Sequence, residues 1–365
     1  MMNGGGQTGV QNMRIAVIGA GGVGGGFGAA LAKAGADVTF VARGAHLAAM
    51  REHGLRVEGD RGETLINPVQ ATDDPASVGP VDIVLFCVKL WDIESAGELM
   101  KHKGVALLVV TGGPGVVKAA MASGKKAICA GPGNPPAVVD ATADLVKAGK
   151  DLVAGASFDN NVICTDEKEI LAVDSIVDVL KKEMTKNGAF ELSASQAQAV
   201  TTVALPESEK TGPGRHSPPN KDLVGKDPFV IARAAGIDVP AETRILLMDV
   251  PQDHPLVWSE QLMPVIPLVR MRNVDEAIDL AARVEHGFRH TASIHSHDIE
   301  KLSRMAKVMN CSIFVKNGPN FAGLGEGGAG YASFTIASPT GEGVTRARTF
   351  TRERRCTLVD YFRII

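Results

Sequence analysis

The chain has 365 residues, a formal net charge of −3 at pH 7 and five cysteines. This length can bury a large core and predicts two or three domains. Acidic and basic residues are nearly balanced and there is no basic tract, so a nucleic-acid partner is not expected. No run of about eighteen apolar residues is present, so no transmembrane helix is expected either. An odd number of cysteines without metal-ligand spacing is typical of a reducing compartment, which favours a cytoplasmic location and no bound metal.

The N-terminal quarter contains a glycine motif between two apolar strands. Residues 1–12 are polar and glycine-rich and predict a disordered tail. The run 14–18 predicts a buried parallel strand, followed by a glycine-rich helix to about residue 33 and a second strand at 37–42. Gly19, Gly21 and Gly24 between them form G-x-G-x-x-G in the context that dinucleotide binding requires. There they permit a tight turn and a close approach of the backbone to a pyrophosphate.

Arg43 stands at the end of the second strand, where an acidic residue would hold a free ribose 2′-hydroxyl. A guanidinium suits a ribose 2′-phosphate, so this half of the chain favours NADP over NAD. The alternative is that Arg43 is an ordinary solvated charge.

Residues 13 to about 94 resemble the N-terminal domain of ketopantoate reductases. The matching stretches are residues 13–28, 38–44, 71–75 and 81–89. The resemblance implies that Lys89 lies near cofactor and substrate. The catalytic lysine and the helical substrate domain of that family have no counterpart further along, so reduction of ketopantoate is not expected.

A second feature is the run 157–169, which places a single thiol, Cys164, between an asparagine pair and charged residues. Asn160 and Asn161 would put amide donors beside the sulfur, and the residues after it mark the boundary of an element. We therefore expect a partly exposed thiol that ionises more readily than Cys87, Cys129, Cys311 or Cys356. The alternative is an inert, buried cysteine, which is the commoner case.

The remaining elements follow from apolar runs and turn residues. We expect strands at 105–110, 126–130, 245–250 and 293–296, helices at 140–150, 224–235 and 274–284, a strand and an amphipathic helix within 170–198, and a polar loop at 206–222. The strands at 105–110 and 127–130 are expected to continue the sheet of residues 13–98.

From Leu99 to Ile365 the chain resembles CoA-acylating aldehyde dehydrogenases of the propionaldehyde and acetaldehyde type, in 111–115, 128–136, 157–169, 254–265 and 285–292. The resemblance implies a Cys164 nucleophile assisted by Asn161, and His290 as the base that activates coenzyme A. It implies that Thr111, Gly112 and Gly113 contact NAD(P) and that Glu260 holds the nicotinamide ribose. The stretch 128–131 lacks the glutamate that activates water in hydrolytic relatives, which suits an acyl intermediate that waits for a thiol.

Together these features predict an α/β fold, a Rossmann-type parallel sheet joined to an aldehyde-dehydrogenase-like catalytic domain. We expect a dinucleotide-binding domain at 13–98, the rest of the cofactor domain at 99–150, a catalytic domain at 151–345 and a C-terminal oligomerisation strand at 346–365. The expected reaction oxidises a short-chain aldehyde to acyl-CoA with NAD(P) and coenzyme A, in a homo-oligomer located in the cytoplasm or in a bacterial microcompartment. The alternative is a non-catalytic or vestigial NADP-binding chimera.

Overall fold

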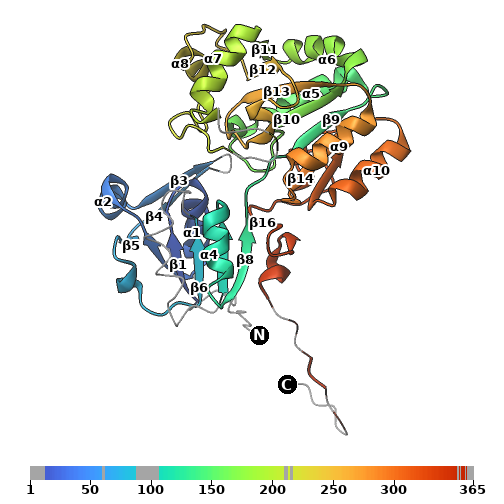
Figure 1. The fold of residues 1–365 in the computed structure, drawn as a ribbon. Coiled ribbons are helices and arrows are strands. Elements are labelled where there is room, and N and C mark those ends of the chain that lie inside the picture. Colours follow the sequence, from blue (N-terminus) through green and yellow to red (C-terminus); the bar gives the residue numbers. More distant parts are fainter. Residues whose placement is uncertain are drawn as a thin grey trace.

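The structure is a computed structural model that describes residues 13–59, 62–87, 107–208, 213, 217–351, 353, 355–357 and 359. Two parallel sheets, one from each half of the chain, each carry helices on their faces and form two units placed one above the other (Figure 1). The chain passes from the first unit to the second through residues 131–135, between the sixth strand of the first sheet and the central strands of the second.

The first sheet has the strand order β5-β2-β1-β6-β7-β8. Its strands are β1 (Arg14–Ile18), β2 (Asp37–Val41), β5 (Gln70–Thr72), β6 (Ile83–Phe86), β7 (Leu107–Thr111) and β8 (Lys126–Ala130). In chain order this reads third, second, first, fourth, fifth, sixth, which is the doubly wound order of dinucleotide-binding folds. A hairpin of β3 (Leu55–Gly59) and β4 (Gly62–Ile66) stands apart from this sheet.

The two parts of the first sheet join without interruption. β6 pairs in parallel with β7, with Val84 opposite Leu108, and β7 pairs with β8. The expectation that 105–110 and 127–130 continue the N-terminal sheet is therefore confirmed. Residues 88–106, which include Lys89 and the expected boundary at 98, lie outside the described residues.

Helices α1 (Gly22–Lys33), α2 (Gly44–His53) and α4 (Pro114–Met121) cover the first sheet. Its apolar side chains form two clusters, one around Phe40 and one around Val110. Gly28 lets α1 approach β2 closely, because a Cβ at Gly28 would lie 2.3 Å from the ring of Phe40.

The second sheet has seven parallel strands in the order β11-β12-β13-β10-β9-β14-β15. They are β9 (Pro136–Val139), β10 (Glu169–Val173), β11 (Ala189–Glu191), β12 (Ile245–Asp249), β13 (Val265–Met271), β14 (Thr291–His295) and β15 (Ile313–Lys316). The helices are α5 (Leu145–Ala156), α6 (Asp174–Lys186), α7 (Ala194–Ala204), α8 (Pro228–Ala234), α9 (Val274–Val284) and α10 (Ile299–Met309). Two large apolar clusters lie on its two faces, so its strands are buried on both sides.

The prediction of a helix at 140–150 is wrong about where the helix begins. The strand β9 ends at Val139, and α5 begins only at Leu145, after Asp144 has accepted a hydrogen bond from the backbone N–H of Lys147. The carboxylate of Asp140 instead accepts bonds from Ala141 N and from the Thr142 hydroxyl, which stabilises a turn rather than a helix.

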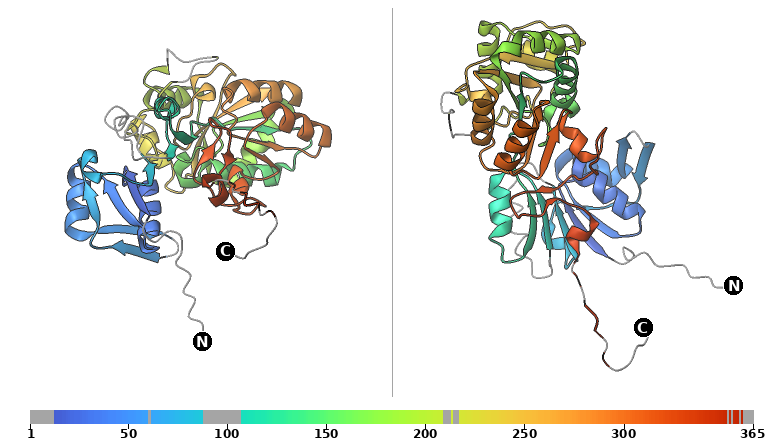
Figure 2. Two further views of the ribbon diagram at one scale, coloured as in Figure 1. Left: turned by 90° about the horizontal axis from the view of Figure 1, so that it is seen from below. Right: turned by 90° about the vertical axis from the view of Figure 1, so that its right-hand side faces the viewer.

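After β15 the chain returns to the first sheet (Figure 2). The short strands β16 (Ile336–Ala337) and β17 (Gly343–Val344) form a ladder there. The backbone N–H of Cys129 donates to Thr340 Oγ1 at 3.0 Å, and the Phe27 and Phe334 rings meet edge to face at 5.2 Å. We call residues 331–345 the return segment. Through these contacts it connects the C-terminal part of the chain to strand β8 and helix α1 of the first unit.

Within the C-terminal strand expected at 346–365, the described residues form a 3-10 helix at Ala347–Phe350 and no strand. Cys356, Thr357 and Val359 are exposed and have no regular secondary structure, and the other residues of 356–362 lie outside the described part. Among the described helices, none is long and apolar enough to cross a membrane.

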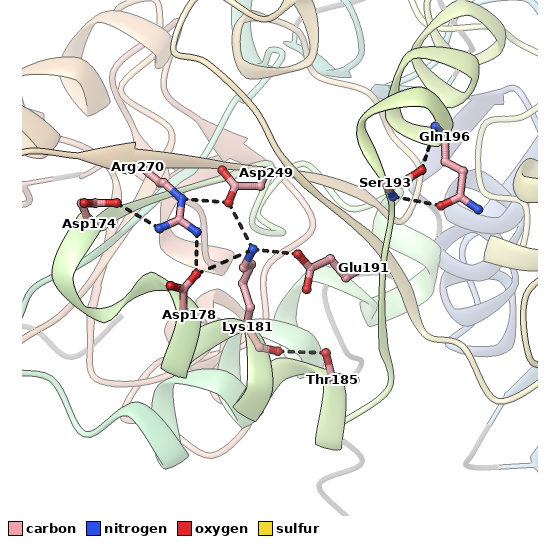
Figure 3. A network of polar contacts seen from close by, with 9 residues as sticks. All are labelled: Asp174, Asp178, Lys181, Thr185, Glu191, Ser193, Gln196, Asp249 and Arg270. Carbon is pink, nitrogen blue, oxygen red and sulfur yellow. Dashed lines mark hydrogen bonds and ion pairs between the residues drawn. The ribbon is translucent and has the colours of Figure 1, made fainter.

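An ion-pair network joins the carboxyl ends of β12 and β13 to α6 and β11 (Figure 3). The guanidinium of Arg270 donates to Asp249, Asp174 and Asp178, and Lys181 donates to Glu191 and Asp249. A hollow of about 550 Å³ lies beside this network. Because Arg270 is fully occupied by carboxylates, the network fixes the arrangement of these elements.

Candidate functional site

The predicted catalytic residues come from loops that precede neighbouring strands of the second sheet. Cys164 lies five residues before β10, Glu260 five before β13, and His290 directly before β14. Parallel strands place their amino ends on one edge of a sheet, so these loops meet although they are far apart in the sequence. The loop 131–135 before β9 reaches the same edge.

Gly133 lies at the centre of this group. Its backbone N–H donates to Glu260 Oε1 at 3.2 Å. A Cβ at Gly133 would lie 2.5 Å from the carbonyl oxygen of Cys164 and 3.1 Å from Cγ of His290. The structure thus brings Cys164, Glu260 and His290 around one glycine, where no other residue type has room.

The loop that carries Cys164 has an unusual backbone. Asp159, Asn160 and Asn161 have φ values of 43°, 52° and 62°, so three successive non-glycine residues are left-handed. Such residues are uncommon, and they persist only where the surroundings hold them. Buried Lys168 closes the loop, since its Nζ donates to Asn161 O, Asn161 Oδ1 and Ile163 O at 2.8, 2.7 and 3.1 Å.

The expectation that the asparagine pair offers amide donors to the sulfur is wrong. Nδ2 of Asn160 donates to Gly225 O and to the Asp227 carboxylate. Nδ2 of Asn161 donates to the carbonyl oxygens of Ala156 and Glu167. Both amides therefore hold the loop in place, and the catalytic role expected for Asn161 becomes that of a support for the backbone.

Cys164 is partly exposed, as expected, but its thiol is not primed to ionise in this state. Burial of the thiol, and next the negative charge of Glu260, raise its pKa to about 12. The pKa of Cys311 is also about 12, and those of Cys87 and Cys129 are about 11, all raised chiefly by burial. Burial thus raises the pKa of all four of these thiols, and the lower pKa expected for Cys164 is not seen in this state.

His290 is fully buried, and burial lowers its pKa to about 4. The imidazole is therefore neutral at physiological pH. Its Nδ1 shares a 2.9 Å hydrogen bond with Thr291 Oγ1, while Nε2 has no hydrogen-bond partner among the described residues. A neutral ring with a free nitrogen can accept a proton from a thiol, provided that Nε2 carries the lone pair.

Glu260 is 8% exposed, and burial raises its pKa to about 7. The positive charge of Lys168 and the Gly133 N–H work against this rise. The pKa of Glu260 thus lies near neutrality, and its ionised carboxylate offers two acceptor oxygens to a ribose diol.

The first sheet carries the expected nucleotide residues at its carboxyl edge. Gly19 has φ 91° and ends β1, and a Cβ at Gly24 would lie 2.0 Å from Gly19 O. A Cβ at Gly21 or Gly22 would meet nothing within 4 Å. The three glycines of the motif thus have distinct roles: Gly19 forms the turn, Gly21 leaves room for a ligand to approach, and Gly24 permits close packing. The backbone at Gly21, which has no side chain near it, fits a pyrophosphate at the start of α1.

The other expected cofactor residues lie along the same edge. Arg43 is exposed and precedes α2 directly after β2. Thr111 ends β7, and Gly113 is the N-cap of α4. Gly112 donates its backbone N–H to Ala130 O at 3.1 Å, so it supports the turn.

Sequence reasoning missed two residues of the site, Gly133 and Lys168. The signal for Lys168 was a lysine inside the run Asp166 to Glu169, just before an apolar strand, where all four residues are buried. Gly133 carried no signal, because its role depends on three loops distant in sequence. Among the described residues, no group of three or more His, Cys, Asp or Glu is placed to hold a metal ion.

Comparison with known families gives two matches along the chain. The model of ketopantoate reductase PanE/ApbA matches residues 15–109, and the model of the aldehyde dehydrogenase family matches residues 82–203 and 243–338. The two matches overlap in the region where β6 pairs with β7.

The chain is similar to curated and solved proteins of the second kind. It is 53% identical over 285 residues to the acetaldehyde dehydrogenase (acetylating) of Bilophila wadsworthia, covering 77% of this chain and 59% of that protein. It is 46% identical over 329 residues to acetaldehyde dehydrogenase (acetylating) EutE of Salmonella typhimurium, covering 90% and 69%. The crystal structure of Rhodopseudomonas palustris propionaldehyde dehydrogenase with bound CoA and an acylated cysteine matches with a TM-score of 0.74 and 39% identity, covering 95% of this chain and 75% of that one. The chain thus spans about three-fifths of the length of the first of these relatives.

Proposed function

Because the chain belongs to the aldehyde dehydrogenase family, we propose that it oxidises a short-chain aldehyde to an acyl-CoA with NAD(P)+ as oxidant. The observation that carries this proposal is the meeting of Cys164, Glu260 and His290 around Gly133. The names of the relatives, acetylating acetaldehyde dehydrogenases, point to the same reaction.

In the first half-reaction the Cys164 sulfur, after losing its proton, adds to the aldehyde carbon and forms a thiohemiacetal. Its own backbone N–H, which already lowers the pKa of the thiol, is placed to stabilise the oxygen anion. Bound NAD(P)+ supplies the oxidation by accepting the hydride from that carbon. The product on the enzyme is a thioester of Cys164.

In the second half-reaction the thiol of coenzyme A attacks the thioester carbonyl. We assign to neutral His290 the acceptance of the CoA proton. Collapse of the tetrahedral adduct breaks the bond to Cys164 and releases acyl-CoA, and the cysteine takes up a proton again. The stretch 128–131 offers no acid that would activate water, so the thioester is held for a thiol.

We further propose that one dinucleotide spans the whole carboxyl edge of the first sheet. The strands β2 and β1 would hold the adenosine side, with Gly19, Gly21 and Gly24 at the pyrophosphate and Arg43 at a ribose phosphate. Thr111 and Gly113 would lie on the nicotinamide side. Glu260 would then meet the nicotinamide ribose from the second sheet. Because β9 belongs to the second sheet and α5 packs in its core, we place the limit between the units at residues 131–135 rather than at residue 150: the cofactor unit takes 13–130, and the catalytic unit begins at 136.

The proposed partners are a short-chain aldehyde and coenzyme A, within a homo-oligomer. All five cysteines are free, which accords with a cytoplasmic location, including the lumen of a bacterial microcompartment.

A coupled assay tests the proposal directly. The full chain is mixed with propionaldehyde, CoA and either NAD+ or NADP+, and propionyl-CoA is measured by mass spectrometry. We expect CoA-dependent product with a preference for NADP+. Binding of NADP+ without any acyl-CoA would instead support a nucleotide-binding protein without catalysis.

A further inference from the structure

We propose that Lys168 is a positioning residue, whose buried ammonium group both holds the left-handed turn before Cys164 and keeps a positive charge beside the reactive sulfur. This inference rests on the proposed role of Cys164 as nucleophile. It goes further, because it assigns to a residue outside the expected catalytic set the shape and the charge of the cysteine loop.

The hydrogen bonds fix the position of the ammonium group. Lys168 is fully buried, and its Nζ has three acceptors at 2.7–3.1 Å, namely both oxygens of Asn161 and the carbonyl oxygen of Ile163. An ammonium group has three N–H donors, so each finds one partner. Ile163 directly precedes Cys164, which places the cation one residue from the thiol.

The same bonds stabilise an unfavourable backbone. Asp159, Asn160 and Asn161 are all left-handed, and Asn161 is fully buried. The Asn160 side chain donates to Gly225 O and Asp227, and the Asn161 side chain donates to Ala156 O and Glu167 O. Lys168 anchors the carbonyl end of the turn from within, so without it the buried oxygens of Asn161 would lose their donor.

The charges around the thiol explain why the anchor is a lysine. Glu260 and Asp166 raise the pKa of Cys164, and Lys168 lowers it. Asp159 raises the pKa of Asp166, and His290 is neutral because its pKa is about 4. Glu167 and Glu169, which flank Lys168 in the sequence, are buried, and burial raises the pKa of each while Lys168 lowers it. Lys168 also lowers the pKa of Asp166 and Glu260, against the larger effect of burial, and it offsets the effect of their negative charge on the sulfur.

Lys168→Met tests the role of the charge on the intact chain. Cys164 is alkylated with iodoacetamide at pH 9, where Glu260 is ionised, and its modification is followed by peptide mass spectrometry. We expect alkylation at least tenfold slower than in the wild type, since one pKa unit is a factor of ten in thiolate at a pH below the pKa. Lys168→Arg, which keeps the charge, should restore most of the rate, and Glu260→Gln should raise the rate above that of the wild type. An unchanged rate in folded Lys168→Met would overturn the proposal.

A second pair of variants tests the role in holding the turn, including the case in which Lys168→Met folds but is less stable than the wild type. Asp159 is exposed and left-handed, so Asp159→Gly relieves the backbone while Asp159→Asn removes only the charge. In the Lys168→Met background, Asp159→Gly should raise the melting temperature above that of Asp159→Asn by more than it does with Lys168 present. Equal gains in both backgrounds would show that Lys168 does not hold the turn. Neither measurement needs turnover, so a wild type that makes no acyl-CoA refutes the proposed function and leaves this test standing.

Discussion

At the scale of single residues, the site couples a weakly acidic thiol to a carboxylate that titrates near neutrality. Cys164 has a pKa of about 12 and Glu260 one of about 7. A neighbouring anion disfavours the thiolate, so any contact that neutralises Glu260 also activates Cys164. Protonation of Glu260 would do this, whereas hydrogen bonds from a nicotinamide ribose would favour its ionised form.

The variant Cys164→Ala should abolish acyl-CoA formation, because the other thiol at the amino edge of the second sheet, Cys311 before β15, donates to Ile313 O and is not among the residues that meet at Gly133. Binding of NADP+, measured by titration calorimetry, should stay within a factor of about two of the wild type. Cys356→Ala, at an exposed cysteine far from the site, is the matched control and should keep full activity. Residual acyl-CoA in Cys164→Ala would assign the nucleophile elsewhere.

His290→Ala should separate the two half-reactions. In the proposed mechanism the neutral ring acts only on the CoA thiol. Formation of reduced cofactor in the first turnover should therefore remain fast. The steady-state rate should fall by about 10²-fold or more, the usual contribution of a general base. Stopped-flow absorbance at 340 nm distinguishes the burst from the steady state, and loss of the burst itself would place His290 in the hydride step instead.

At the scale of elements, the glycine loop of the first sheet divides its work among positions that sequence alone cannot tell apart. Gly21→Ala adds a methyl group that meets nothing, whereas Gly24→Ala adds one 2.0 Å from Gly19 O. We expect Gly21→Ala to keep the melting temperature and to weaken NADP+ binding about tenfold or more, because the methyl group blocks the approach of the pyrophosphate. Gly24→Ala should lower the melting temperature by several degrees. Calorimetry of the unliganded proteins checks both, and equal stability losses would contradict the division.

The elements that sequence patterns predicted well are those with strong local signals. The buried run at 14–18, the strand 126–130 and the amphipathic helix at 274–284 appear with the expected limits. The strand β9 was missed because Pro136 opens it and only four residues form it. The direction of the Asn160 amide could not be predicted, since its partners Gly225 and Asp227 are distant in the sequence and are brought near only by the fold.

At the scale of the whole molecule, buried ionisable groups give stability two opposite dependences on pH. Burial lowers the pKa of His254, His290 and His295 from 6.5 to about 4, so the unfolded chain binds more protons and stability rises with pH up to about 6.5. Burial raises the pKa of Asp166 to about 7 and that of Glu167 to about 8. For these carboxyl groups the folded chain holds more protons, so stability falls as pH rises from about 4.5 to 8.

Above pH 6.5 only the carboxyl effect remains among these groups. We therefore expect the melting temperature to fall steadily between pH 6.5 and 8.5, and Glu167→Gln to make that decline shallower, since the amide cannot ionise. Asn320 N, which donates to Glu167 Oε1 at 2.8 Å, keeps an acceptor in this variant. Differential scanning fluorimetry across this range is sufficient, and a flat profile in the wild type would show that these carboxyl groups are not held protonated.

The pairing of β6 with β7 in the first sheet has a consequence for protein engineering. The matches to the reductase model and to the dehydrogenase model overlap over residues 82–109, where Val84, Leu85 and Phe86 pair with Leu108, Val109 and Val110. Backbone hydrogen bonds between apolar strands depend little on the identity of the side chains. The pair β6 and β7 therefore tolerates a strand taken from another protein. The adenosine-binding half of the sheet can then be exchanged as a unit. A graft of residues 13–87 from another dinucleotide-binding protein would change the coenzyme preference and leave the catalytic residues around Cys164 unchanged.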